Sequence, residues 1–216
     1  GNVGNGFGGD DFYLSAQYVI NPHKKAKHAL LLGSKLPLNQ SDLKSANKVL
    51  PMQYQSSLGT IDLIVGYSIQ YKRLLLDFAL QQPLSGRNRN TFLPEYWNND
   101  AAFKYAPSND FNRKGDVLLS MAYQLISSKK YFLQGTVLGI YHLMEDTYVD
   151  ANKSISPIKI MGSQGLTVNL AAKFLYLLNP NFTVGATVAA PIIVRKIRPD
   201  GLTRSFVLSP VLSIHF

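Results

Sequence analysis

The chain has 216 residues, a net charge of +9 and no cysteine, which permits one closed sheet and excludes disulfides, thiolate metal sites and thiol nucleophiles. Charged residues make up only 16% of it, against roughly 25% in an ordinary soluble domain, and no apolar run reaches the roughly 18 residues of a transmembrane helix. The basic residues gather in short turns and not on an aromatic face, which argues against a nucleic-acid partner.

Apolar and polar residues alternate with a period of two in nine segments, which predicts an all-β chain. Each segment is about 9 to 14 residues long, enough for a tilted strand to cross a bilayer. In chain order the predicted strands cover residues 11–20, 28–36, 61–71, 74–81, 117–125, 131–144, 166–176, 182–192 and 206–216. The third strand is the most regular, with Ile61, Leu63, Val65, Tyr67 and Ile69 alternating with Asp62, Ser68 and Gln70.

The predicted connections alternate in length along the chain. Tight turns at 21–27, 72–73, 127–130 and 178–181 interleave with long polar loops at 38–57, 85–114, 145–164 and 195–204. Short periplasmic turns and long extracellular loops are typical of outer-membrane barrels, whereas a soluble all-β sandwich has no reason to segregate them. We therefore predict one domain over 1–216, a transmembrane antiparallel up-and-down β-barrel with about ten strands' worth of sequence, in the outer membrane of a Gram-negative bacterium.

One face of the predicted barrel is polar along its length. Its candidate lumen-facing side chains are Asp62, Gln70, Asp77, Gln81, Gln124, Gln134, His142, Asn169 and Lys173. A polar inner wall either lines a water-filled path or forms a packed hydrogen-bond network, and both alternatives stay open. Charges on this face are costly unless they are paired or hydrated, so structural ion pairing is preferred over a substrate path for Asp62, Asp77 and Lys173.

The longest predicted loop, 85–114, is rich in aromatic residues. They are Tyr96, Trp97, Phe103, Tyr105 and Phe111. Surface loops that keep this many aromatic side chains usually fold onto something. We expect the loop to fold inward as a lid that gates the barrel, with partner binding as the alternative.

The last predicted strand ends in an aromatic residue. Its apolar face consists of Phe206, Leu208, Leu212, Ile214 and Phe216. This arrangement looks like the signal that is read by the outer-membrane assembly machinery. Barrels of this kind have an even number of strands and both chain ends in the periplasm, so at least one strand is expected to precede the first visible one.

Two segments resemble a known family. The segment that begins at Gly6 reads GFGGDDFYLSAQYVINPHKKAKHALLLGSKLPL, and Leu58–Leu84 reads LGTIDLIVGYSIQYKRLLLDFALQQPL. Together, over about the first 85 residues, they resemble the outer-membrane proteins labelled "MetA-pathway of phenol degradation", which are related to fatty-acid and aromatic-hydrocarbon transporters. The resemblance implies a barrel of about twelve strands, hence a missing amino-terminal piece, and uptake of small, often aromatic, molecules.

The sequence offers little catalytic chemistry. The four histidines are scattered and do not supply three clustered ligands, so neither a metal site nor a cofactor is predicted. His142 and Asp146 near the outer rim are residue types that an acid–base catalyst uses, but no serine is convincingly placed to join them. We therefore do not predict an enzyme.

Two functions remain. The first is a channel or transporter for passage of a small, aromatic or hydrophobic solute across the outer membrane. The alternative is a structural barrel subunit of a larger envelope complex, with no transport role. The expected partners are the lipid bilayer, lipopolysaccharide and the assembly machinery, together with other envelope proteins in the alternative. A continuous lumen favours the first function and a plugged lumen the second.

Overall fold

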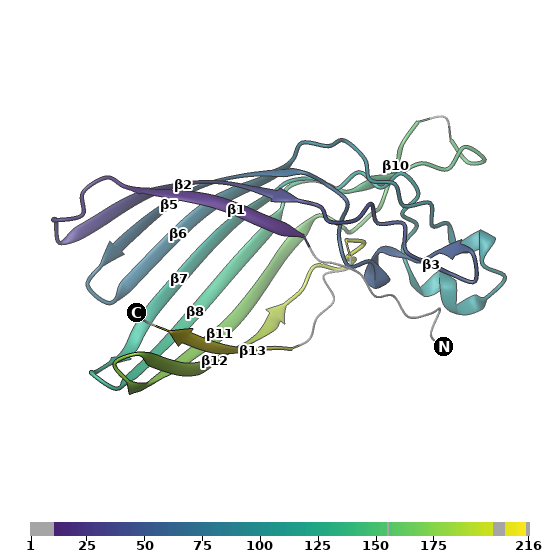
Figure 1. Cartoon of the computed structure of the whole chain (residues 1–216). Coiled ribbons are helices and arrows are strands. Elements are labelled where there is room, and N and C mark those ends of the chain that lie inside the picture. The colour runs from purple at the N-terminus through teal and green to yellow at the C-terminus, as the bar shows by residue number, and fades with distance from the viewer. Residues whose placement is uncertain (1–10, 155, 201–205, 215–216) are drawn as a thin grey trace.

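The computed structural model describes residues 11–154, 156–200 and 206–214, and within them the chain is all-β. Nine of the described strands form one antiparallel sheet (Figure 1). They are β1 (Phe12–Val19), β2 (Ala26–Leu36), β5 (Asp62–Tyr71), β6 (Leu74–Pro83), β7 (Asp116–Ser127), β8 (Tyr131–His142), β11 (Gly165–Asn179), β12 (Phe182–Ile193) and β13 (Val207–Ile214). Among the same residues, no helix is long and apolar enough to cross a membrane.

The order of the sheet follows the chain. Each strand pairs with the next one in sequence, so the described sheet runs β1-β2-β5-β6-β7-β8-β11-β12-β13. Because every neighbouring pair is antiparallel, β1 and β13 run in the same direction at the two edges. No described residues pair these edges, so the nine strands do not by themselves close into a barrel.

The nine strands predicted from the alternation of residues are confirmed, and their ends shift by a few residues. The largest extension is in β11, which continues to Asn179 because its pairing with β12 follows the strands down to their turn. The sheet holds nine described strands, against the expectation of about ten. Closure of the sheet and its position in a membrane stay predictions.

The two faces of the sheet differ in chemistry, as β5 illustrates. Leu63, Val65 and Tyr67 are exposed on the outer face, while Asp62 is fully buried on the opposite face. The neighbouring strands present apolar residues on the same outer face, since Val65 lies between Leu32 of β2 and Leu80 of β6. The result is one continuous apolar outer face and one inner face with most of the polar groups.

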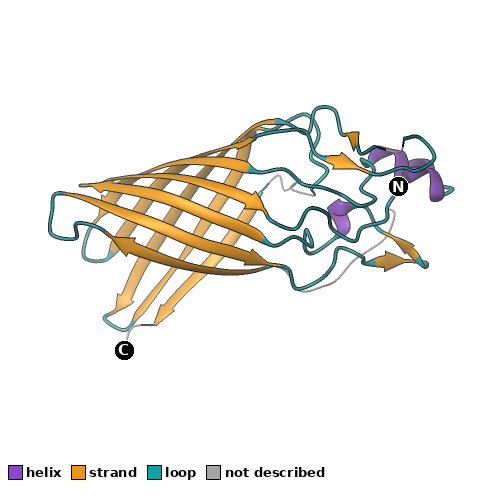
Figure 2. Ribbon diagram, turned by 90° about the horizontal axis from the view of Figure 1, so that it is seen from above, coloured by secondary structure: helices purple, strands orange, loops and turns teal. Residues whose placement is uncertain are grey.

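The long loops fold together at one end of the sheet (Figure 2). We call residues 38–60, 85–115, 143–164 and 194–200 the cap. The cap contains short elements that the sequence did not predict. They are β3 (Lys44–Ser45), β4 (Lys48–Val49), η1 (Met52–Tyr54), η2 (Pro94–Tyr96), η3 (Asp100–Lys104), β9 (Thr147–Tyr148) and β10 (Ile158–Lys159).

Two small apolar clusters hold the cap together. The first contains Leu50, Phe92, Ala101 and Ala102, and the second contains Met52, Leu93, Phe111, Tyr148 and Ile160.

The buried side chain of Asn90 ties the cap segments to one another. It donates to the carbonyls of Ser41 and Leu50 at 2.8 and 3.0 Å and accepts from Phe92 N and Ser108 Oγ at 2.9 and 2.8 Å. With these four bonds, both ends of the amide are satisfied. The cap is therefore a folded unit and not a set of free loops.

Candidate functional site

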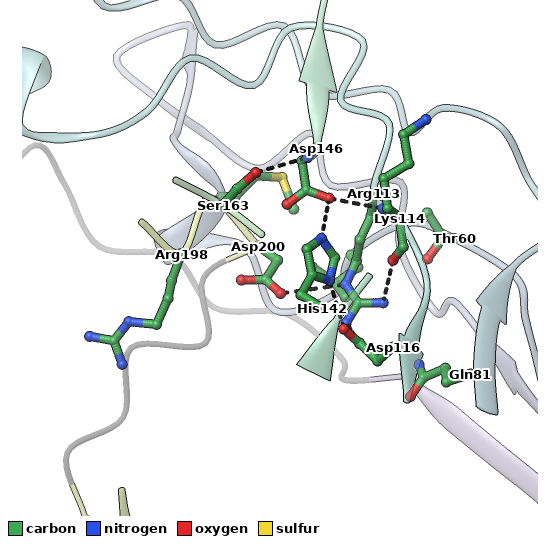
Figure 3. Close-up of polar contacts among 12 residues, drawn as sticks. Thr60, Gln81, Arg113, Lys114, Asp116, His142, Asp146, Ser163, Arg198 and Asp200 are labelled. Carbon is green, nitrogen blue, oxygen red and sulfur yellow. Dashed lines mark hydrogen bonds and ion pairs between the residues drawn. The ribbon is translucent and has the colours of Figure 1, made fainter. Parts of the chain in front are cut away.

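Charged side chains gather where the inner face of the sheet meets the cap (Figure 3). We call this group the mouth network. Its members are Asp11, Lys35, Thr60, Asp62, Gln81, Arg113, Asp116, His142, Asp146, Ser163, Arg195 and Asp200. Together they connect the cap ends of five strands to all four cap segments.

Lys35 is the centre of one half of the network. Its side chain has no exposed surface, and its Nζ lies 3.2 Å from Asp62 Oδ2 and 3.3 Å from Asp11 Oδ2. Nζ also donates to Thr60 Oγ1 at 3.0 Å, and Thr60 in turn donates to Asp62 Oδ1 at 2.7 Å. Gln81 Nε2 donates to Asp62 Oδ2 from the neighbouring strand. A buried cation is thus balanced by two carboxylates, which is the arrangement that burial of charge requires.

His142 is the centre of the other half. Its Nδ1 lies 2.6 Å from Asp116 Oδ1 and its Nε2 lies 2.8 Å from Asp146 Oδ1. If both carboxylates are ionised, both ring nitrogens must donate, which only the imidazolium form does. The ring therefore joins the end of β7 to the cap segment that follows β8.

Two arginines complete this half from the cap. Arg113 forms ion pairs with Asp116 and Asp200, and Arg195 forms an ion pair with Asp200. Burial alone would raise the pKa of Asp200, but the two guanidinium groups outweigh it and hold that pKa below its usual value. Burial likewise works against the charge of Arg113, yet Asp116 and Asp200 raise its pKa above the usual value. Both groups are therefore held in their charged forms.

Ser163 belongs to the network but is not arranged as a nucleophile. Its Oγ accepts from Asp146 N at 2.8 Å and donates to Ile160 O at 2.7 Å. Both nitrogens of His142 are occupied by carboxylates, so the imidazole does not face this hydroxyl. An activated serine needs a base within hydrogen-bond reach. The geometry around His142 instead serves to hold strands and cap together.

A cavity of about 370 Å³ lies beside the network. Arg113, Asp116, His142 and Asp200 form one part of its wall. Uncharged residues of the inner face form another part: Ile140, Thr167, Asn169, Ala189, Pro191 and Val207. The cavity is large enough for a small organic molecule. Within the described ranges, no group of three or more metal-ligating side chains is present.

The register places all nine candidate lumen-facing residues on the inner face of the sheet. The mouth network brings together Asp62, Gln81 and His142. The other six are Gln70, Asp77, Gln124, Gln134, Asn169 and Lys173, and they lie along the same face outside the network. That this face lines a lumen stays a prediction.

The three predicted charges on this face differ in their contacts. Asp62 is paired with Lys35, and Asp77 accepts from Ser68 Oγ at 2.6 Å. Lys173 lies next to Gln134 and has no acidic partner among the residues that the structure describes. Ion pairing is therefore found for Asp62, with Lys35 as the partner that the sequence did not indicate, and among the described residues it is found neither for Asp77 nor for Lys173.

The aromatic residues of the 85–114 loop separate into two groups. Phe111 is buried in the second cap cluster, while Trp97 and Tyr105 pack against the first. Tyr96 and Phe103 are exposed. Three of the five therefore pack within the cap instead of forming a common lid surface. A gating role for the segment stays a prediction.

The predicted assembly signal lies partly outside the described residues. Leu208, Leu212 and Ile214 share the exposed outer face of β13, and Phe206 just before it is also exposed. Phe216 falls beyond the described range. Recognition by an assembly machinery stays a prediction.

Comparison of the sequence with protein-family models and with curated proteins gives no match. The resemblance to the phenol-degradation family of outer-membrane proteins therefore stays a prediction. The arguments for function that follow depend on the geometry of the chain itself.

Proposed function

We propose that this protein is an outer-membrane β-barrel that lets a small solute cross the membrane. The observation that carries the proposal is the apolar outer face of the nine described strands. Exposed aromatic and aliphatic side chains cover this face on strand after strand, including Leu32, Val65, Phe78, Leu119 and Leu170. A surface of this extent is unfavourable in water and suits the hydrocarbon of a bilayer.

The directions of the edge strands set a condition that a barrel would have to meet. Since β1 and β13 run in the same direction, one more antiparallel strand between them would complete a barrel of ten. A barrel of twelve, with three further strands, satisfies this requirement equally well.

Passage of a solute is supported by the cavity beside the mouth network. The cavity is lined both by residues of the inner face and by cap residues, so it lies where a solute that enters from the cap end would meet the inner face of the sheet. Its size suits a small molecule and not a polymer.

A second function has one observation in its favour. The mouth network and the two cap clusters fasten the loops over the end of the sheet, as a plugged barrel would require. Such a barrel would serve as a structural subunit of an envelope complex. The two proposals differ in one measurable property, which is the permeability of the folded protein.

Swelling of proteoliposomes in solutes of graded size tests the proposal. Wild-type protein should admit small solutes, with a rate that falls steeply as solute size approaches that of the cavity. His142→Ala removes the link between Asp116 and Asp146 and should raise the rate, because it loosens the cap over the cavity. His28→Ala is the matched control, since His28 lies on the outer face and bonds to the Tyr67 hydroxyl.

Folding is checked in each sample by a heat-modifiable band on a semi-native gel. Solute passage would be overturned, and the structural subunit favoured, if vesicles with folded wild type and vesicles with folded His142→Ala both swell no faster than protein-free vesicles. If His28→Ala raises the swelling rate as much as His142→Ala does, the role given to the mouth network is overturned.

A further inference from the structure

A second hollow, of about 540 Å³, lies on the cap. We call it the basic groove. Four cations line it, and the described lining residues include neither aspartate nor glutamate. The cations are Lys104, Lys159, Lys196 and Arg198, and Phe103 and Met161 are the most exposed apolar residues of its wall. The groove therefore combines uncompensated positive charge with apolar surface.

The cations of the groove differ from those of the mouth network in having no partners. In the network, Lys35, Arg113 and Arg195 each pair with at least one carboxylate. In the part of the chain that the structure describes, Lys159 and Lys196 make no ion pair and no side-chain hydrogen bond.

Lys104 and the guanidinium of Arg198 likewise have no such contact in the described ranges. Figure 3 shows the Arg198 side chain extending away from the network. Like charges held close together repel, so an anion that neutralises them is attracted.

The apolar side chains of the groove are largely exposed to solvent. Phe103 is 63% exposed and Met161 is 70% exposed. Covering such side chains is favourable by about 25 cal/mol per Å² of apolar surface. The groove is also preformed, because Tyr148 and Ile160 in its floor belong to the second cap cluster. A preformed floor lowers the conformational entropy that the protein loses when a ligand binds.

We propose that the basic groove binds a small organic anion that carries an apolar ring or chain. Its acidic group meets Lys159, Lys196 and Arg198, and its apolar body covers Phe103 and Met161. Arg198 also lines the inner cavity, so the groove and the cavity lie on either side of one residue. The assignment of this ligand as the transported solute depends on the proposed function, whereas the binding site does not.

Equilibrium dialysis with radiolabelled 2-naphthoate tests the site, with the full chain held in lipid nanodiscs. The neutral 2-naphthamide has the same ring and should bind at least about tenfold more weakly, because it lacks the charge. Lys159→Glu/Lys196→Glu should weaken naphthoate binding by at least about tenfold, since like charges then face the ligand. Both lysines are exposed, so the double variant is expected to fold.

Lys44→Glu/Arg87→Glu is the matched control. It makes the same change in net charge at exposed positions of the cap outside the groove and should leave the affinity within about twofold. Equal losses in the two double variants would show unspecific attraction and overturn the site. Equal binding of the acid and the amide would overturn it as well.

Lipopolysaccharide carries acidic groups and apolar chains too, so purified lipopolysaccharide is tested as a competitor. If lipopolysaccharide displaces naphthoate and no flux of naphthoate into proteoliposomes is seen, the groove binds lipid, and the proposal of a small-solute ligand is overturned. Solute flux without naphthoate binding would overturn the groove alone. Binding without any solute flux would overturn the proposed passage and leave the groove in place.

Discussion

Replacement of Lys35 by methionine should destabilise the protein more than any change on the outer face. The Nζ atom lies 3.2 Å from Asp62 Oδ2 and 3.3 Å from Asp11 Oδ2, with no exposed side-chain surface. At an effective dielectric constant of about 20, attraction across such a distance is about 5 kcal/mol per pair, and desolvation offsets much of it. Methionine keeps the apolar stem but leaves two carboxylates close together without their cation, for which we expect a loss of about 3 to 5 kcal/mol.

Equilibrium unfolding in urea, with the protein in lipid vesicles, measures this loss. Trp97 is the only tryptophan of the chain and packs against the first cap cluster, so its fluorescence reports on the cap. The semi-native gel reports separately on the strands. Lys27→Met is the control because Lys27 lies on the same face of β2 but is exposed, and its effect should stay within about 0.5 kcal/mol.

A double-mutant cycle with Asp62→Asn separates the ion pair from packing effects. If the pair matters, the double variant Lys35→Met/Asp62→Asn should be less destabilised than the sum of the single changes, by about 1 to 3 kcal/mol. The reasoning fails if Lys35→Met costs no more than Lys27→Met, or if the two changes in the cycle are additive.

Three further predictions follow from the cap, the sheet and the chain end. The pKa of Asp200 is depressed below 3.8, so its carboxylate stabilises the fold above that pH and the contribution is lost as pH falls through the lower folded value. Asp200→Asn should therefore reduce the urea midpoint at pH 7 but much less at pH 2; an equal reduction at both values would contradict this. Cysteine at Val65 should resist a membrane-impermeant thiol reagent while cysteine at Ser68 reacts, and equal labelling would refute the assignment of faces. Phe216→Ala should reduce the folded band in outer membranes far more than Phe12→Ala, and similar bands would count against the assembly signal.

The sheet was predictable from the sequence because its determinant is local. Side chains of a strand alternate between two faces, so a surface that meets two different environments imposes a period of two on the residues. Val65 and Asp62 follow this rule, and their positions in β5 agree with it. The order of the strands was also predictable from local features, because two strands that are joined by a tight turn must be neighbours in the sheet.

The mouth network was not predictable in this way because its partners are distant along the chain. Arg113 and Asp200 are 87 residues apart, and no local pattern links them. Lys35 received no role within the predicted strand 28–36, although its position on the inner face, opposite Asp62, was a usable signal. His142 and Asp146 were noticed as a pair, but the partner on the other side of the ring, Asp116, was missed. The cap clusters were missed because their apolar residues follow neither the period of a strand nor that of a helix.

The wide separation of the network's partners bears on the order of assembly. Asp11 precedes the first described strand, and Asp200 follows the eighth in the order of the sheet. Lys35 finds both of its carboxylates within the first three described strands, whereas the ion pairs of Arg113 and Arg195 with Asp200 form only after the eighth, and until then these cap segments carry unpaired charges. Such segments stay hydrated and sensitive to protease while the strands pair. Resistance of the cap to proteolysis would thus mark the last stage of biogenesis, later than the acquisition of the sheet itself.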